Sequence, residues 1–154
     1  MAVKEDISMR LLRCVGLIRV AQIKECLVGD EFVMGKNGIA YIDPSFRDIT
    51  KNERVCAQSG TRLSRTVLRR AVPSRDIIAE IGCGEKAQTS YGDLLGALRS
   101  GKLSKQTRQV FFIAEYAIRI EWILNGWSIH AFSKDAPGEW SIGRQFIFRG
   151  PLCG

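Results

Sequence analysis

The residues best suited to bind a ligand are the arginines between Ser45 and Arg75. This segment contains eight basic residues and only two acidic ones, and hydroxyl side chains stand between its arginines. A guanidinium group is always charged and donates two hydrogen bonds in a planar fork that matches a phosphate group. Such side chains can follow a phosphate backbone without reading bases. The predicted phosphate contacts are Arg54, Arg62, Arg65, Arg69 and Arg70.

The chain as a whole is also basic. Its 154 residues carry a formal net charge of +7. A field of this sign favours nucleic acid, another polyanion such as an anionic membrane surface, or an acidic protein as the partner. Binding to nucleic acid would then be mostly electrostatic and weakly sequence-specific. The alternative for the arginine segment is a solvated surface that acidic residues elsewhere neutralise.

No residue pattern predicts a catalytic or metal site, and we expect no cofactor. The single histidine, His130, falls opposite Glu121 in a predicted hairpin, where such a pair stabilises a sheet as readily as it orients a catalytic imidazole. The five cysteines lack Cys-x-x-Cys spacing, which argues against a zinc site. An odd, unpatterned set of cysteines is typical of thiols in a reducing compartment. We therefore expect an intracellular protein, cytoplasmic or nuclear.

A short glycine-rich run suggests a different chemistry. A strand predicted over residues 75–81 carries Glu80 near its end and is followed by Gly82 and Gly84. This pattern resembles the first motif of S-adenosylmethionine-dependent methyltransferases. The resemblance implies cofactor binding at residues 82–85, because glycines let the backbone approach a ligand closely. The third expected glycine is Lys86, and the chain behind it indicates antiparallel strands instead of alternating strands and helices. A methyltransferase-like enzyme is therefore the third of our hypotheses.

The clearest structural signal is the run from Ile118 to Phe132. Two apolar stretches flank Asn125-Gly126, a dipeptide that suits a two-residue type I′ hairpin turn. The resulting register places Trp122 opposite Ile129, with the apolar side chains sharing one face of the sheet. Residues 140–148 are predicted to add a third strand, which completes an antiparallel meander whose last, aromatic strand is an exposed edge.

The remaining segments predict a second hairpin and short helices. Residues 31–42 suggest a hairpin, because a Gly/Asn turn separates two apolar runs. Residues 8–28 favour a helix that becomes a strand near Gly16, with a buried strand as the alternative. A helix over residues 61–71 would present Arg62, Arg65 and Arg69 on one side. A second helix over residues 91–99 is predicted from its Ser90 cap, and residues 109–117 are predicted as a strand.

These expectations combine into a single basic α+β domain over residues 1–154. Its sheet would be mainly antiparallel, with an N-terminal hairpin, a C-terminal three-stranded meander and two or three short helices. The preferred function is a small non-enzymatic binding protein that contacts nucleic acid or another polyanion through residues 47–75. The alternative is a homo-oligomeric structural protein, of the viral-matrix or mobile-element accessory type, that self-assembles through the meander edge. No apolar run reaches the roughly 20 residues of a transmembrane helix, so no transmembrane segment is predicted.

Overall fold

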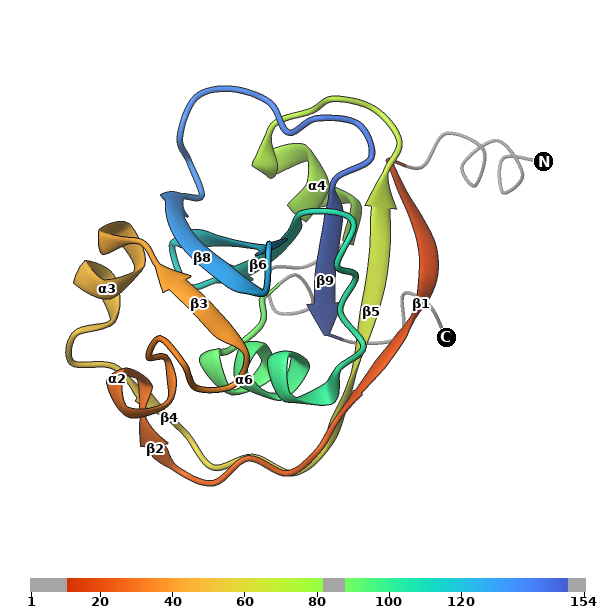
Figure 1. The fold of residues 1–154 in the computed structure, drawn as a ribbon. Coiled ribbons are helices and arrows are strands. Elements are labelled where there is room, and N and C mark those ends of the chain that lie inside the picture. The colour runs from red at the N-terminus through yellow and green to blue at the C-terminus, as the bar shows by residue number, and fades with distance from the viewer. Residues whose placement is uncertain (1–10, 82–87, 150–154) are drawn as a thin grey trace.

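The computed structural model describes residues 11–81 and 88–149. Within these ranges the chain forms nine strands and four helices (Figure 1). In chain order they are β1 (Leu12–Val20), β2 (Cys26–Leu27), α2 (Val28–Glu31), β3 (Ile39–Ile42), α3 (Pro44–Thr50), β4 (Arg54–Val55), β5 (Thr61–Leu68), α4 (Ser74–Ile81), α6 (Tyr91–Ser100), β6 (Gln109–Ile113), β7 (Tyr116–Ile123), β8 (Gly126–Ser133) and β9 (Gln145–Arg149).

Seven of these strands form one mixed sheet in the order β1-β5-β9-β6-β7-β8-β3, while β2 and β4 form a separate pair. The last strand, β9, pairs antiparallel with β5 and parallel with β6, and β3 pairs parallel with β8. The predicted α+β fold with a mainly antiparallel sheet is therefore wrong. The protein is mostly β, and its central sheet mixes parallel and antiparallel pairs. No helix within the described ranges is long and apolar enough to cross a membrane.

The predicted N-terminal hairpin does not form. Residues 28–31 are the short helix α2, turns follow, and only residues 39–42 of the predicted hairpin are a strand. Phe32 is held by the core, since its ring packs against that of Phe46 with 5.4 Å between centroids. The apolar residues before the turn therefore have no partner strand in β3, which pairs with β8 instead.

Strands β1 and β5 replace two predicted helices. They pair antiparallel along their whole length, from Leu12 opposite Leu68 to Val20 opposite Thr61. Within residues 8–28, the alternative of a buried strand is confirmed for residues 12–20, and the helix predicted before Gly16 is wrong for the described residues. The helix over residues 61–71 is also wrong. The β-branched residues of β5 suit a strand. Because both sides of β5 are covered, its buried positions do not alternate strictly, which gives the sequence a misleading helical spacing.

Residues 74–81 form helix α4, where a strand was predicted. Ile77 and Ile81 lie one turn apart and pack into the same buried cluster. The carboxylate of Glu80 accepts the backbone N–H groups of Leu11 and Leu12 at 2.6 and 2.7 Å. The methyltransferase resemblance required a strand here, so this part of it is wrong. Its glycine turn, residues 82–85, lies outside the described residues.

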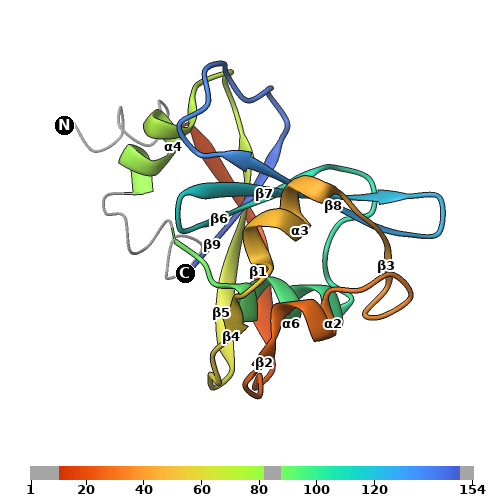
Figure 2. The same cartoon turned by 90° about the vertical axis from the view of Figure 1, so that its left-hand side faces the viewer.

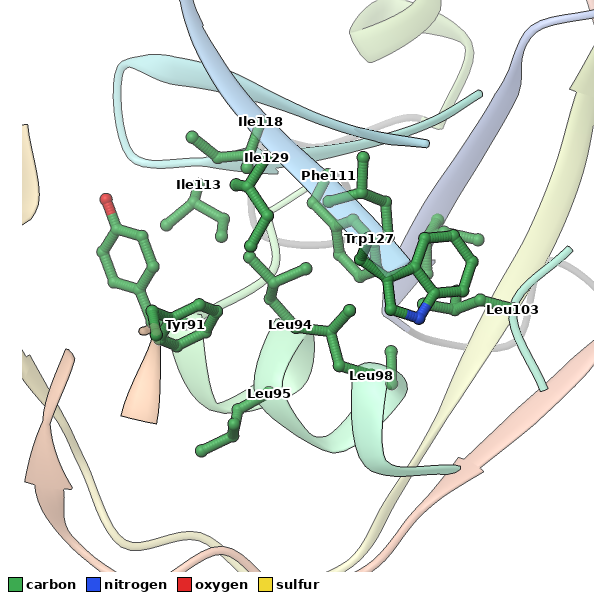
Figure 3. Close-up of a cluster of buried hydrophobic side chains, with 14 of the residues drawn as sticks. Tyr91, Leu94, Leu95, Leu98, Leu103, Phe111, Ile113, Ile118, Trp127 and Ile129 are labelled. Carbon is green, nitrogen blue, oxygen red and sulfur yellow. The ribbon is translucent and has the colours of Figure 1, made fainter. Parts of the chain in front are cut away.

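The two sides of the sheet carry separate apolar clusters, and Figures 1 and 2 show α6 below and α4 above the central strands. On the α6 side, Leu94 and Leu98 point toward strand residues such as Phe111 and Ile129 (Figure 3), and Leu95 is buried in the same cluster. On the α4 side, the buried cluster includes the rings of Phe112, Phe146 and Phe148, with Ile77 of α4 packed among them. The predicted helix over residues 91–99 is confirmed, including its capping box of Ser90 and Asp93.

The predicted β7–β8 hairpin exists, but its register differs by two residues. Trp122 lies opposite Trp127, and the turn is Leu124-Asn125, with a positive φ of 57° at Leu124. A shift of two leaves every side chain on the predicted face, because strand side chains alternate with period two. Gly126 belongs to β8, and a Cβ atom there would collide with Ala40 of β3. This glycine therefore permits the close approach of β3 and is not a turn residue.

The predicted C-terminal meander is also wrong in its third strand. Strands β6, β7 and β8 form the meander, and β9 returns to the middle of the sheet between β5 and β6. Phe146, Ile147 and Phe148 are fully buried there. The self-assembly hypothesis therefore has no exposed aromatic edge at β9.

Candidate functional site

The structure does not gather the five predicted arginines into one site. Arg62 lies near the start of β5 and Arg69 directly follows its end; at a rise of about 3.3 Å per residue, their backbones are roughly 23 Å apart. Arg62 and Arg65 are three positions apart, so their side chains leave opposite sides of the sheet. Arg65 Nη1 donates a hydrogen bond to the carbonyl oxygen of Lys102 at 3.2 Å.

The other two predicted arginines lie elsewhere on the surface. Arg54 forms an exposed ion pair with Glu25 across 3.1 Å, and Arg70 is exposed in the loop after β5. Arg62 gains one basic neighbour from outside the segment, because Arg19 of β1 lies opposite it. The role of these arginines in phosphate contacts remains a prediction, and they would have to act at separate places on the surface.

Three other arginines converge on the α4 side of the sheet, beyond the apolar cluster. Arg108 directly precedes β6, Arg144 directly precedes β9, and Arg119 lies within β7. The pairing of Gln109 with both Gln145 and Ile120 places Arg144, Arg108 and Glu121 in one row across three neighbouring strands. We call Arg108, Arg119, Arg144 and Glu121 the arginine cluster.

The arginine cluster holds more positive than negative charge. Arg108 Nε donates to Glu121 Oε2 at 2.8 Å, and Arg119 Nη2 lies 3.8 Å from the other carboxylate oxygen. Arg144 forms no ion pair with any described residue, and its guanidinium lies over the ring of Trp140, 5.5 Å from the centroid. Within the cluster, three permanent positive charges therefore share one carboxylate, and the nearby Asp43 carboxylate adds a weaker attraction for Arg119.

This charge is partly withdrawn from water. The side chains of Arg119 and Glu121 are 20% and 18% exposed, and Arg119 Nε is buried with no hydrogen-bond partner in the described part of the chain. Burial and then repulsion from Arg108 and Arg119 lower the pKa of Arg144. Burial also lowers the pKa of Arg119, against the attraction of Glu121. Both groups stay charged at neutral pH, since arginine titrates far above it.

Partly exposed rings border the arginine cluster on β8 and β3. The guanidinium of Arg119 lies over the ring of Phe132, 5.0 Å from its centroid, and Phe132 is 39% exposed. On the neighbouring strand, Tyr41 is 44% exposed and its ring lies 5.8 Å from that of His130. We call Tyr41, His130 and Phe132 the aromatic flank. The arrangement places charged forks beside flat apolar surfaces on one side of one sheet.

His130 does not lie opposite Glu121 as predicted, because the register places it opposite Arg119. Its ring nitrogens instead lie 3.5 Å from Ser128 Oγ and 3.7 Å from Asp43 Oδ1. These distances exceed those of good hydrogen bonds, and Ser128 is fully buried, so the three residues are not arranged as an accessible nucleophile and its base.

Asp43 has a structural role in this group. Its carboxylate accepts the Ser45 N–H at the start of α3 at 3.0 Å and the Tyr41 hydroxyl at 3.2 Å. Hydrogen bonds from Ser45 and Tyr41 lower the pKa of this carboxyl. The carboxylate thus caps α3 and helps to hold β3 beside β8.

The arginine cluster could not be found by reading the sequence locally. Its arginines lie in three separate segments. Each is next to, or within, a strand of mainly apolar residues that has no other distinguishing feature. The available signal was the alternation along β7, which places Arg119 and Glu121 on one side of a strand whose other side is apolar. The partners Arg108 and Arg144 depend on pairing β6 with both β7 and β9, and the parallel pair with β9 was not predicted.

Comparisons with known proteins found no family model, no curated protein and no solved structure that matches this chain. Within residues 11–81 and 88–149, no group of three or more histidine, cysteine, aspartate or glutamate side chains is arranged to hold a metal ion. The geometry and charge of the sheet surface are therefore the basis for inferring a function.

Proposed function

We propose that this protein binds single-stranded nucleic acid on the α4 side of its sheet, without catalysing a reaction. The observation that carries the proposal is the unbalanced charge of the arginine cluster, partly desolvated and bordered by exposed rings. The three guanidinium groups of the cluster outnumber its single carboxylate, and the resulting positive charge attracts a polyanion. Partial burial strengthens that attraction, because the effective dielectric constant is lower than in water.

The mixture of groups favours single strands over duplexes. Unstacked bases can lie on aromatic rings or guanidinium planes, while arginine and lysine side chains contact the phosphates. Phe132 and Tyr41 supply partly exposed rings on β8 and β3. Arg119 lies against the Phe132 ring, and Arg108 and Arg144 supply further charges on the same side of the sheet. A duplex would keep its bases stacked inside and would use only the charges. We therefore expect tighter binding to single-stranded oligonucleotides.

Each residue of the arginine cluster has a distinct part in this proposal. Glu121 orients the guanidinium of Arg108 through their 2.8 Å hydrogen bond. Arg144 is not held by any carboxylate in the described residues, which leaves its donors available for a phosphate. Arg119 Nε is a buried donor without a partner, and an anion bound above it would receive its hydrogen bond.

The proposal is tested by fluorescence anisotropy with short labelled RNA and DNA, single-stranded and duplex, at several salt concentrations. For phosphate contacts, the logarithm of the association constant falls linearly with the logarithm of salt concentration. The double variant Arg108→Gln/Arg144→Gln should weaken binding at least tenfold and reduce the single-strand slope by about 1.4, at about 0.7 per lost contact.

The matched control removes the same charge from β5 and the residue that directly follows it. The variant Arg62→Gln/Arg69→Gln should change affinity less than threefold, since these residues lie apart from the arginine cluster. Equal losses in the two double variants would show that net charge alone drives binding. Loss in the β5 variant alone would instead identify the predicted arginine segment as the binding surface, and either result would overturn the proposal.

A further inference from the structure

A second candidate site lies between helices α2 and α3, on the α6 side of the molecule and away from the arginine cluster. Figures 1 and 2 both show these two helices next to each other. The space between them is a cavity of about 530 Å³. Cavities of roughly 300–1,000 Å³ are the usual size for small-molecule binding sites.

The cavity has an apolar interior and an apolar entrance. The buried rings of Phe32 and Phe46 and the side chain of Ile42 line its inner part. Val33 and Met34 also line it, although they are 39% and 60% exposed. Exposed apolar side chains next to a hollow favour a ligand with apolar surface, since burying that surface is favourable.

The charged residues that line the cavity are both basic. Arg47 and Lys51 are four positions apart at the end of α3, which places them on the same side of the helix. Both are exposed, and neither forms an ion pair with a described residue. None of the lining residues is acidic, and the lining hydroxyl of Thr50 already donates to the Phe46 carbonyl at 2.8 Å. The polar groups left for a ligand are therefore two cations.

We propose that this cavity binds a free single-chain amphiphile with an anionic head, of the fatty-acid type. The carboxylate would contact Arg47 and Lys51, and the alkyl chain would lie against Phe32, Phe46 and Met34. An apolar chain alone would not use the cations, and a small anion alone would leave the apolar interior empty. Affinity should therefore require both parts, and should rise roughly threefold to fourfold for each added methylene group that is buried.

The first experiment measures displacement of a fluorescent fatty-acid probe from the full chain. Decanoate should displace the probe and dodecanoate should do so at lower concentration, whereas dodecyltrimethylammonium, with the same chain and the opposite charge, should not. The variant Arg47→Gln/Lys51→Gln should bind the probe at least tenfold more weakly. The control variant Arg69→Gln/Arg75→Gln removes two exposed charges from outside the cavity and should bind as the wild type does.

A second variant tests the apolar part independently of charge. Gly29 lines the cavity, and a Cβ atom added there meets no other atom within 4 Å. Gly29→Leu should fold normally, as its melting temperature will show, and should weaken probe binding by partly filling the cavity. Equal displacement by the anionic and cationic amphiphiles, or unchanged binding in both variants, would overturn the proposal.

A vesicle experiment distinguishes a free ligand from a membrane surface. Phosphatidylcholine vesicles with and without phosphatidylserine are sedimented together with the protein. Displacement of the probe by decanoate without sedimentation on the acidic vesicles supports a site for a free amphiphile. Sedimentation on acidic vesicles without any displacement by free decanoate would overturn the proposal, because Arg47 and Lys51 would then belong to a membrane-contact surface.

Discussion

Two charged groups in this protein show opposite ways of placing arginine in a partly buried environment. At the start of α6, Asp93 is fully buried and Arg149 Nε donates to it at 2.6 Å. Gln58 donates to the same carboxylate at 2.9 Å, and the Ser90 N–H does so at the same distance. Here one cation meets one anion, and the carboxylate is fully hydrogen-bonded. We call these residues the Asp93 network.

In the arginine cluster the balance is different, since three guanidinium groups share Glu121 and one buried donor has no partner. The comparison suggests that charged groups differ in role according to whether all their hydrogen bonds are made within the protein. A complete network stabilises the fold, whereas an incomplete one on a partly exposed surface leaves attraction for a partner. The same substitution made in each group should therefore have opposite consequences.

The largest effect should come from Arg149→Gln in the Asp93 network. This substitution leaves the buried Asp93 carboxylate without its cation. Because the Arg149 side chain is 42% exposed, water screens part of the attraction, and we expect a cost of about 2–3 kcal/mol of unfolding free energy. Urea denaturation measures the loss. Oligonucleotide affinity of the folded variant should stay within threefold of wild type. A loss of stability below about 1 kcal/mol would show that the network is not the structural group described here.

Alkaline pH should expose a second, intermediate effect near the same network. Burial raises the pKa of the Tyr91 phenol to about 12. The unfolded chain ionises this group near pH 10, so the stabilising contribution is complete below that value and disappears as the pH rises through 12. The expected loss is on the order of 2 kcal/mol.

Stability measured by urea denaturation between pH 9 and 12 checks this effect, with Tyr91→Phe as the comparison. The phenylalanine variant lacks the ionisable group and should show a shallower decline over that range. Matching declines in the two proteins would indicate that the start of α6 is open to water. The Asp93 network would then be no more shielded from water than the arginine cluster, and the contrast between them would not hold.

The smallest stability change should come from Arg144→Gln in the arginine cluster. Arg108 and Arg119 repel this guanidinium and no described carboxylate pairs with it, so its removal should leave the unfolding free energy within about 0.5 kcal/mol of wild type. Binding to single-stranded oligonucleotide should nevertheless weaken severalfold. A destabilisation similar to that of Arg149→Gln would show that both groups are structural.

The elements predicted correctly are those whose stabilising contacts lie close together in the sequence. The capping box of Ser90 and Asp93 and the apolar face of α6 are determined within about one helical turn, so that helix was predicted correctly. The alternation along β7 and β8 also fixed which side chains share a side of the sheet. The exact turn was missed because the approach of Ala40 explains Gly126, and no local pattern shows that contact.

Long-range pairing accounts for what the sequence did not show. The β1–β5 pair makes strands of two segments that have helical spacing, and the parallel β3–β8 and β6–β9 pairs join segments far apart in the chain. The candidate site follows the same rule. The arginines concentrated in residues 47–75 are dispersed by the fold, whereas Arg108, Arg119 and Arg144 are brought together by it.

The central position of β9 also constrains how the chain can fold during its synthesis. Translation produces β9 after the other described strands, yet it is the strand that joins the β1–β5 pair to the group β6, β7, β8 and β3. Until residues 145–149 leave the ribosome, the strand edges that later flank β9 stay unpaired. Unpaired edges and uncovered apolar surface make a nascent chain prone to aggregation. The growing chain should therefore expose these two edges until residues 145–149 are released, and the sheet should close only afterwards.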